Sequence, residues 1–390
     1  MIRHATWSPS SQRTRALAIL CGIFVAHLGH AADQTSAPSP SVEQTDAWPV
    51  FRGDAASTGV AHTKLPDKPA VVWKKNFKDG GFEATAAIVD GVIYVGSFDG
   101  NLYALSLADG KEKWRFHTEL GFKAAPAVRD GVVYIGDVDG KFYAIDAAGG
   151  KEKWAVASGA EINAGANFYR DHVLFTSQDG GFYCLKPDNG HLVWKYTIDN
   201  MIQCSPTVVE NRGFLAGCDG KLHVVDLDKG EAAALVDIGD PTLSTPAALG
   251  DAVYFGTQGG RFLAVDWRQA KQLWSFAPKR KQPLLSSSAV SGGLAVFGGK
   301  DRAVHALKLA SGEESWTFPT RGAMDSSPVV VGDRVFVGGG GGRLYALDLK
   351  SGEKVWEYEA GGHFAASPAA AESRLVIGND AGDLYCFGAK

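Results

Sequence analysis

Apolar and polar residues alternate along short segments of this chain, and the same set of segments recurs about every forty residues. In residues 124–157 these segments are AAPAVR, VVYIGD, KFYAID and EKWAVA. Alternation with a period of two is typical of half-buried β-strands, because successive side chains point to opposite faces of a sheet. Between the segments stand Asp130-Gly131, Asp139-Gly140 and Gly149-Gly150, dipeptides that accept the positive φ of tight hairpin turns. Each copy is therefore predicted to be a four-stranded antiparallel meander.

Tryptophan marks the fourth segment of most copies. It stands there at Trp73, Trp114, Trp154, Trp194, Trp274, Trp316 and Trp356. One double-length interval contains a degenerate copy, in which Gly230 aligns with Gly110 and Ala234 takes the tryptophan position. Eight copies of a four-stranded unit predict an all-β fold, an eight-bladed β-propeller of four-stranded antiparallel blades. One indole at one equivalent position favours packing between blades over ligand stacking, so Ala234 is expected to mark the loosest junction.

The two ends of the repeated region are complementary. The last copy stops at Lys390 without its tryptophan segment, whereas VVWKKNF, at Val71–Phe77, precedes the first complete copy. We therefore expect this N-terminal strand to lie in the last blade and to close the ring, which removes an exposed seam of strand edges.

The first 31 residues have the pattern of a cleaved signal peptide. Arg3, Arg13 and Arg15 precede the apolar run Ala16–Leu28, and small residues follow at Gly29 and Ala31. The run is shorter than the ~20 residues of a membrane span. This pattern predicts a periplasmic or otherwise extracytoplasmic protein with no transmembrane segment; an N-terminal anchor that is retained is the alternative.

Three further segments follow the signal peptide. Residues 32–47 are polar and rich in proline and serine, so they are expected to form a disordered tether. Residues 48–390 are expected to form the propeller, with a lead-in segment at 48–70 and the repeats at 71–390. Once residues 1–31 are removed, 36 basic and 43 acidic residues remain, and the net charge becomes −7 in place of −4. Such a charge does not favour nucleic acid or anionic lipid as a partner.

Four cysteines remain after residue 31. Cys204 and Cys218 stand at the two ends of a hairpin expected to turn near residues 210–213, so a disulfide within blade 4 is one hypothesis and two free thiols are the other. Cys184 and Cys386 replace the alanine of the YAL segment in their copies, and both are expected to be buried thiols.

Candidate chemistry is confined to the segments that join one copy to the next. These segments diverge while the rest repeats, and they are expected to surround the axial mouth of the ring, where a propeller would hold a ligand. The polar residues in them are Glu83, Lys123, Glu161, Asn163, Gln203, Asp325 and His363. Carboxylates with an asparagine are suitable ligands for calcium, and a lysine suits an acidic quinone. Relaxation of loops under no selection explains the same divergence.

No other chemical motif emerges from the sequence. There is no phosphate-binding loop of the Walker type, no Cys-x-x-Cys pair and no His-Glu-x-x-His metal pattern. His223 and His305 occupy the position of Tyr103, Tyr143 and Tyr345 in other copies, so we expect them to be packed aromatic substitutes rather than ligands.

The repeat SPVVVGDRVFVGGGGGRLYALDLKSGEKVW, Ser327–Trp356, resembles that of the pyrroloquinoline-quinone (PQQ)-like propellers, as do the copies from Ala84 and Ala124. The preceding WPVFRGDAASTGV, Trp48–Val60, is similar to the lead-in segment of the same superfamily. The resemblance implies either of two functions. One branch contains non-catalytic scaffolds, with the BamB-type outer-membrane assembly factors nearest in length. The other contains quinoprotein dehydrogenases, which hold PQQ and calcium on the axis.

The two branches differ in features that can be sought in this chain. The dehydrogenases are typically much longer, and their cofactor pocket includes a disulfide between adjacent cysteines, a pair that this sequence lacks. The resemblance therefore favours a monomeric exported scaffold that needs no cofactor, catalyses nothing by itself and binds other envelope proteins, with a role in outer-membrane protein assembly. A redox module that binds PQQ and calcium is the alternative.

Overall fold

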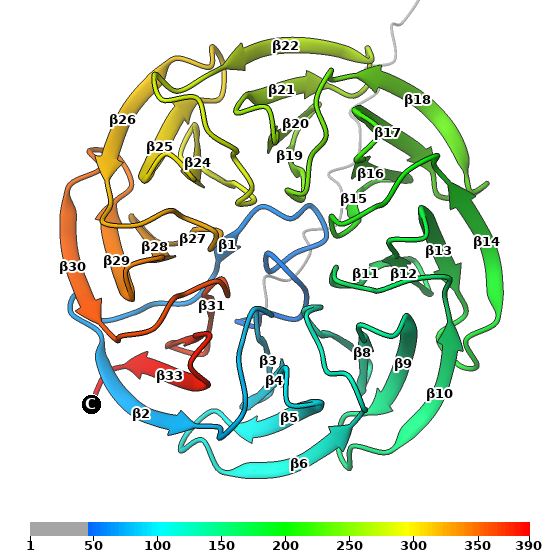
Figure 1. Cartoon of the computed structure of the whole chain (residues 1–390), viewed down its shortest axis with the longest axis vertical. Coiled ribbons are helices and arrows are strands. Elements are labelled where there is room, and N and C mark those ends of the chain that lie inside the picture. The colour runs from blue at the N-terminus through cyan, green and yellow to red at the C-terminus, as the bar shows by residue number, and fades with distance from the viewer. Residues whose placement is uncertain (1–45) are drawn as a thin grey trace, which may run out of the picture. The chain divides into compact units, whose positions relative to one another are not determined.

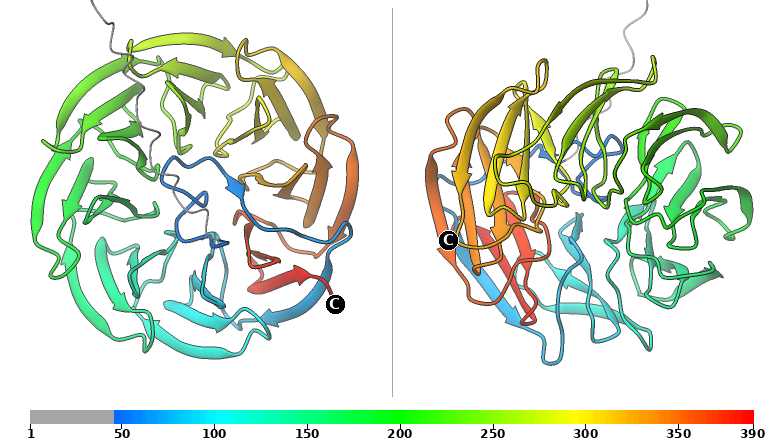
Figure 2. Two further views of the ribbon diagram at one scale, coloured as in Figure 1. Left: turned by 180° about the vertical axis from the view of Figure 1, so that it is seen from behind. Right: turned by 45° about the horizontal axis from the view of Figure 1, so that its top comes forward.

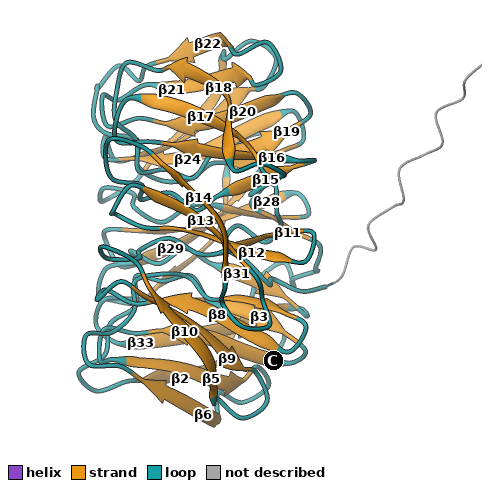
Figure 3. Ribbon diagram, turned by 90° about the vertical axis from the view of Figure 1, so that its right-hand side faces the viewer, coloured by secondary structure: helices purple, strands orange, loops and turns teal. Residues whose placement is uncertain are grey.

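The computed structural model describes residues 46–390, which form a ring of eight blades around a central axis (Figure 1). Every blade contains four antiparallel strands, and one blade carries a short additional strand, β1 (Val60–Ala61). Seen from the side, the ring is a disc with loops on both faces (Figure 3). The predicted eight-bladed propeller is confirmed. The predicted signal peptide and residues 32–45 of the predicted tether lie outside the described residues.

The blades share one strand order from the axis to the rim. The innermost strands are β3 (Ala87–Val89), β7 (Ala127–Arg129), β11 (Asn167–Tyr169), β15 (Thr207–Val209), β19 (Ala247–Leu249), β23 (Ala289–Ser291), β27 (Val329–Val331) and β31 (Ala369–Ala371). The second strands are β4 (Val92–Gly96), β8 (Val132–Gly136), β12 (His172–Thr176), β16 (Arg212–Ala216), β20 (Ala252–Gly256), β24 (Leu294–Gly299), β28 (Arg334–Gly339) and β32 (Arg374–Gly378).

The third strands are β5 (Asn101–Ser106), β9 (Lys141–Asp146), β13 (Gly181–Leu185), β17 (Lys221–Asp226), β21 (Phe262–Asp266), β25 (Ala303–Lys308), β29 (Arg343–Asp348) and β33 (Asp383–Gly388). The outermost strands are β6 (Glu112–His117), β10 (Glu152–Ala157), β14 (Leu192–Thr197), β18 (Glu231–Asp237), β22 (Lys271–Phe276), β26 (Glu314–Pro319), β30 (Lys354–Glu359) and β2 (Ala70–Asn76).

The N-terminal strand closes the ring as predicted. β2 pairs antiparallel with β33, from Ala70 opposite Gly388 to Asn76 opposite Asp383, and so becomes the outermost strand of blade 8. Trp73 lies opposite Cys386, which is the same register as Trp114 opposite Ala104 in blade 1. The first and last segments of the chain are thus joined in one sheet.

The tryptophans pack between blades, as their position predicts. In six of the seven blades with this tryptophan the indole N–H donates to a carbonyl of the next blade; Trp114 Nε1, for example, lies 2.9 Å from the oxygen of Ala147. The indole also covers a glycine of that blade. A Cβ added at Gly150, where φ is +69°, would lie 2.6 Å from a ring carbon of Trp114. Six of the eight junctions therefore combine a tryptophan with a partner glycine.

The junction after Ala234 is filled from the opposite side, which corrects the expectation that it is merely loose. Trp267, only 5% exposed, comes from the next blade and lies 5.4 Å from Phe214. Phe214 is the counterpart of Tyr94, which meets Trp114 of its own blade at 5.8 Å. Ala270 takes the place of the partner glycine and keeps a positive φ of 52°. A Cβ is tolerated at this position because no indole of the preceding blade covers it.

The lead-in segment crosses the centre of the ring and bonds to every blade (Figure 2). We call residues 46–63 the axial plug. Asp46 bonds to Glu372 of blade 8. The bonds of Trp48–Gly59 then run through blades 1 to 7 in order, to Ile88, Val128, Asn167, Val208, Ala248, Val290 and Val330. Since Asp46 accepts the N–H of Glu372 at 2.7 Å, the folded unit begins at least two residues before the predicted Trp48.

Arg52 anchors the axial plug inside the ring. Its side chain is 1% exposed, and Nη2 donates to the carbonyls of Ser288 and Pro328 in blades 6 and 7. Burial lowers the pKa of the guanidinium to about 9, although the nearby Asp54 carboxylate opposes the shift. Desolvation of the charged guanidinium costs free energy, and its hydrogen bonds to the two carbonyls offset part of that cost.

Candidate functional site

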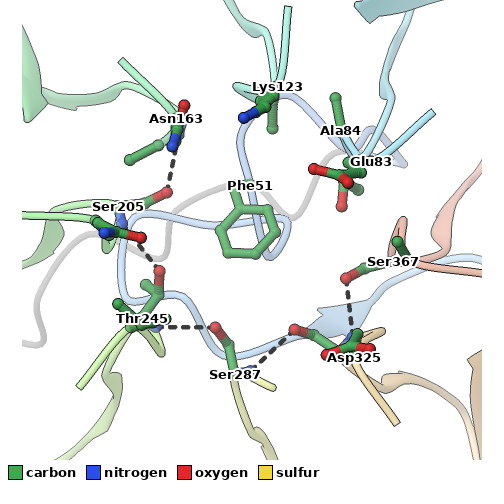
Figure 4. A pocket seen from close by; sticks show the side chains of 18 of the residues that line it. Phe51, Glu83, Ala84, Lys123, Asn163, Ser205, Thr245, Ser287, Asp325 and Ser367 are labelled. Carbon is green, nitrogen blue, oxygen red and sulfur yellow. Dashed lines mark hydrogen bonds between the residues drawn. The ribbon is translucent and has the colours of Figure 1, made fainter. Parts of the chain in front are cut away.

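A pocket with a volume of about 530 Å³ opens on the axis, with the axial plug at its base. All eight inter-blade segments contribute to its wall, as the divergence of these segments predicts (Figure 4). Phe51 of the axial plug forms the floor, and its ring lies at the centre of the pocket. The pocket is thus closed at one end by Phe51 and does not continue as a channel through the ring.

An outer layer of the wall uses one repeat position from each blade. Its members are Glu83, Lys123, Asn163, Gln203, Leu243, Leu285, Asp325 and Ala365, with His363 beside them. Six of the seven predicted residues therefore line the pocket. Glu161 does not line the pocket, but its carboxylate forms an ion pair with Lys123. Leu243 and Leu285 make the sector of blades 5 and 6 apolar, so the polar groups occupy the remainder of the mouth.

An inner layer of hydroxyl groups holds neighbouring blades together. The N–H groups of Gly165, Ser205, Thr245, Ser287 and Ser327 each donate to the hydroxyl oxygen of the next blade, at 2.9–3.0 Å. Four of these five donors are also acceptors in the series, which ends at Ser367. The series spans blades 3 to 8, whereas Ala125 and Gly165 in blades 2 and 3 have no hydroxyl and lie beside Phe51. Because this series of hydroxyl groups accepts hydrogen bonds from buried backbone N–H groups, its first role is structural.

Most charged residues of the pocket are already paired. Lys123 Nζ lies 3.0 Å from Glu161 Oε1, and Gln178 donates to the other oxygen of Glu161. Asp325 contacts Lys300, and His363 Nε2 lies 3.4 Å from its second oxygen. These pairs are partly exposed, so each is worth little to stability. They nevertheless reduce the charge that a ligand would meet.

The pocket residues do not fit PQQ with calcium. In residues 46–390, no three His, Cys, Asp or Glu side chains come close enough together to hold a metal ion. Lys123, the candidate contact for an acidic quinone, is bound to Glu161, and Asp325 is bound to Lys300. Calcium prefers six to eight oxygen ligands, which this set of separated carboxylates does not supply.

Two parts of the pocket were missed by reasoning from the repeat. Leu243 and Leu285 occupy the same repeat position as Gln203, so the repeat does predict their place in the wall, but as apolar residues they carry no sign of ligand chemistry. Phe51 lies in the lead-in segment, which has no second copy in the chain. No periodic pattern therefore places it on the axis.

Of the two alternatives for Cys204 and Cys218, a disulfide or two free thiols, the structure has free thiols. Cys204 is fully buried and packs in the apolar cluster between blades 3 and 4. Cys218 instead directs its Sγ to the carbonyl of Thr242, at 3.7 Å, on the way to blade 5. Cys184 and Cys386 are buried free thiols, as expected.

His223 and His305 pack in the positions of the repeated tyrosine, and their surroundings differ. His305 is in contact with two carboxylates, Asp301 at 3.0 Å and Glu314 at 2.8 Å. Burial disfavours its charged form, but the bonds to these carboxylates outweigh burial and raise the pKa. His223 has one carboxylate, Asp219 at 2.9 Å, and burial prevails, so its pKa is lowered.

Replacing either histidine by the repeated tyrosine is expected to change how stability depends on pH. The raised pKa of His305 gives a contribution that is present below its unfolded value of about 6.5 and lost as pH rises through the folded pKa. The lowered pKa of His223 gives one present above about 6.5 and lost as pH falls through the folded pKa.

Denaturant unfolding between pH 5 and pH 8.5 tests this prediction. The free energy of unfolding of His305→Tyr, taken relative to the unaltered chain, should rise with pH, and that of His223→Tyr should rise as pH falls. Two parallel curves would contradict the assigned shifts.

Comparison with known proteins shows one matching family and several solved structures with the same fold. Residues 65–167, 143–280 and 269–390 match the family described as outer membrane protein assembly factor BamB. No curated protein sequence matches the chain. The crystal structure of BamB from Moraxella catarrhalis is 18% identical and has a TM-score of 0.71, and the match covers 82% of this chain and 100% of that one.

Two other solved structures match at similar levels. Quinohemoprotein alcohol dehydrogenase from Comamonas testosteroni is 15% identical, with a TM-score of 0.74 over 89% of this chain and 81% of that one. The computationally designed Ika8 protein is 15% identical, with a TM-score of 0.71 over 84% and 100%. At such identities these likenesses show the propeller fold alone. The part of the chain that the structure describes has no helix with the length and apolar character of a membrane span.

Proposed function

This chain belongs to the family of the outer membrane protein assembly factor BamB, and we propose that it is an exported scaffold for envelope proteins. In this role it binds other proteins during outer-membrane assembly, requires no cofactor and catalyses no reaction by itself. The proposal places it in an extracytoplasmic compartment, which the signal-peptide pattern of residues 1–31 supports.

One observation carries the proposal: large apolar side chains are exposed on loops of the face that also bears the inter-blade segments of the pocket. Phe98 is 37% exposed, Leu120 56% and Met201 41%. The Phe98 N–H donates to the carbonyl of Gly81, which directly precedes the pocket segment of blade 1. Met201 directly precedes the pocket segment of blade 4, and its carbonyl accepts from the Cys218 N–H. We call Phe98, Leu120 and Met201 the loop-face residues. Apolar groups grouped on one face favour a contact with another protein.

Replacement of all three loop-face residues by alanine is expected to reduce partner retention at least about tenfold, because central apolar contacts are often worth more than ~1 kcal/mol each. The measurement is the recovery of specific envelope proteins with the affinity-tagged full chain. Val355→Ala, which removes an apolar residue 44% exposed on the rim, is the matched control. Equal loss in the control would point to a general effect of hydrophobicity and would contradict a loop-face site.

The axial pocket supplies the opposite test. Lys123→Met and Asp325→Asn should leave partner retention unchanged, because both side chains are tied to neighbours inside the pocket. Purified protein should also show no quinone absorbance after incubation with PQQ and calcium. Dye reduction that depends on an alcohol or sugar, and that is lost in either variant, would replace the scaffold by the redox function.

A further inference from the structure

The outermost strand of blade 4 departs from the other outer strands in composition. β18 reads EAAALVD, in which Ala234 takes the place of the repeated tryptophan and Leu235 follows it. At the position of Leu235, blades 1, 3 and 7 expose Arg115, Lys195 and Glu357. Charged residues on an edge strand normally prevent another chain from pairing with it. β18 lacks this protection over its whole central part.

Apolar side chains continue from β18 onto both adjacent blades. Leu235 is 50% exposed, Leu273 of β22 is 51% exposed, and Leu192 and Val193 of β14 are 57% and 42% exposed. These three strands are consecutive on the rim (Figure 1). On the outer strands of the other five blades, Val355 is the one large apolar residue with comparable exposure in the described part of the chain. The apolar sector of the rim is thus centred on β18.

The altered strand has kept its place in the blade. β18 pairs with β17 from Lys221 opposite Asp237 to Asp226 opposite Glu231, and Trp267 fills the space of the missing indole. The loss of tryptophan has therefore not disrupted the blade. Its changed outer surface is available for another role.

The backbone of β18 determines what kind of partner fits. β18 has β17 on one side and no strand on the other within the described residues, so a row of N–H and C=O groups faces outward. An extended chain satisfies such a row by adding a strand, and its alternate side chains then meet the side chains of the edge. Glu231 and Asp237 are exposed at the two ends and form no ion pair within residues 46–390, which favours basic residues at both ends of the added strand.

We propose that β18 accepts an extended strand from a partner protein, with alternate apolar residues that contact Leu235 and Leu273 and with basic residues at its ends. This surface lies on the rim and is separate from the loop-face residues. The proposal therefore stands or falls independently of the scaffold contact on the pocket side.

The probe is a peptide of roughly ten residues in which valine and threonine alternate between terminal lysines. Its control carries N-methyl groups on alternate residues, which remove the hydrogen bonds of one peptide edge. The unmethylated peptide is expected to bind the full chain at least about tenfold more tightly, by fluorescence anisotropy, and to slow hydrogen exchange in β18. Equal binding of both peptides, or protection elsewhere in the ring, would overturn the proposal.

Two variants locate the contact. Leu235→Lys restores the kind of side chain found at Lys195, so the blade should fold, and it should weaken peptide binding about tenfold or more. Val355→Lys, at the rim of blade 7, should bind as the unaltered chain does; circular dichroism and melting temperature check the fold of both. Sedimentation that shows dimers of the full chain, dispersed by Leu235→Lys, would assign the edge to a second copy and overturn the proposed partner strand.

Discussion

A chain that begins at Lys78 is expected to aggregate or to melt far below the full chain, whereas one that begins at Asp46 should melt with it. The longer deletion removes β2 and its ladder with β33. It also removes Trp73, whose indole donates to Leu107 of blade 1 at 3.0 Å. Loss of a fully buried tryptophan typically costs about 3–5 kcal/mol, which is an upper value for the partly buried Trp73, and the ladder bonds add about 0.5–1.5 kcal/mol each. Blade 8 would then expose β33 as a bare edge.

A third chain separates closure of the ring from the axial plug. A chain that begins at Lys64 lacks the plug but keeps β2, so it should remain monomeric while its melting temperature falls. Calorimetry and sedimentation distinguish the three chains. If the Lys78 chain were monomeric and melted with the Lys64 chain, β2 would not close the ring.

The fold was predictable from the sequence because each blade repeats the same solution to the same packing problem. The Trp73 and Trp114 positions fix the register of their blades, and the missing final segment after Lys390 shows where β2 must go. These are local patterns, repeated often enough to be read without coordinates. The inter-blade segments were predictable as a pocket wall for the complementary reason, since they are the part that does not repeat.

Other features depend on contacts between segments that have no common pattern. Phe51 and Arg52 belong to a segment with no second copy, so nothing in the repeat predicts their place on the axis. Lys123 and Asp325 were expected to face a ligand. Instead each forms an ion pair with a neighbouring side chain, Lys123 with Glu161 and Asp325 with Lys300. The sequence left the choice between a disulfide and two free thiols open at Cys204 and Cys218, because closeness along a hairpin does not set the direction of a side chain.

The junction after Ala234 gives a prediction that the repeat alone would reverse. Leucine is the common residue at the position of Trp267, as at Leu107, Leu227 and Leu349, so Trp267→Leu restores the repeat. We nevertheless expect this variant to be destabilised, by about 2–4 kcal/mol, because large-to-small changes in a core leave a cavity that the surroundings fill only partly. Here the cavity would lie beside Phe214, where Ala234 supplies no indole.

Restoring the whole junction should recover the lost stability. In the triple variant Ala234→Trp, Trp267→Leu and Ala270→Gly, the new indole can cover the glycine introduced in place of Ala270, as Trp114 covers Gly150. Ala234→Trp alone is expected to destabilise, because it meets both Trp267 and the Cβ of Ala270, and overpacking of a filled core costs about 1–3 kcal/mol. Denaturant unfolding of the single variants and the triple variant measures the coupling between these sites. Additive effects would show that Trp267 does not stand in for the missing tryptophan, and a triple variant as stable as the unaltered chain would show that it does.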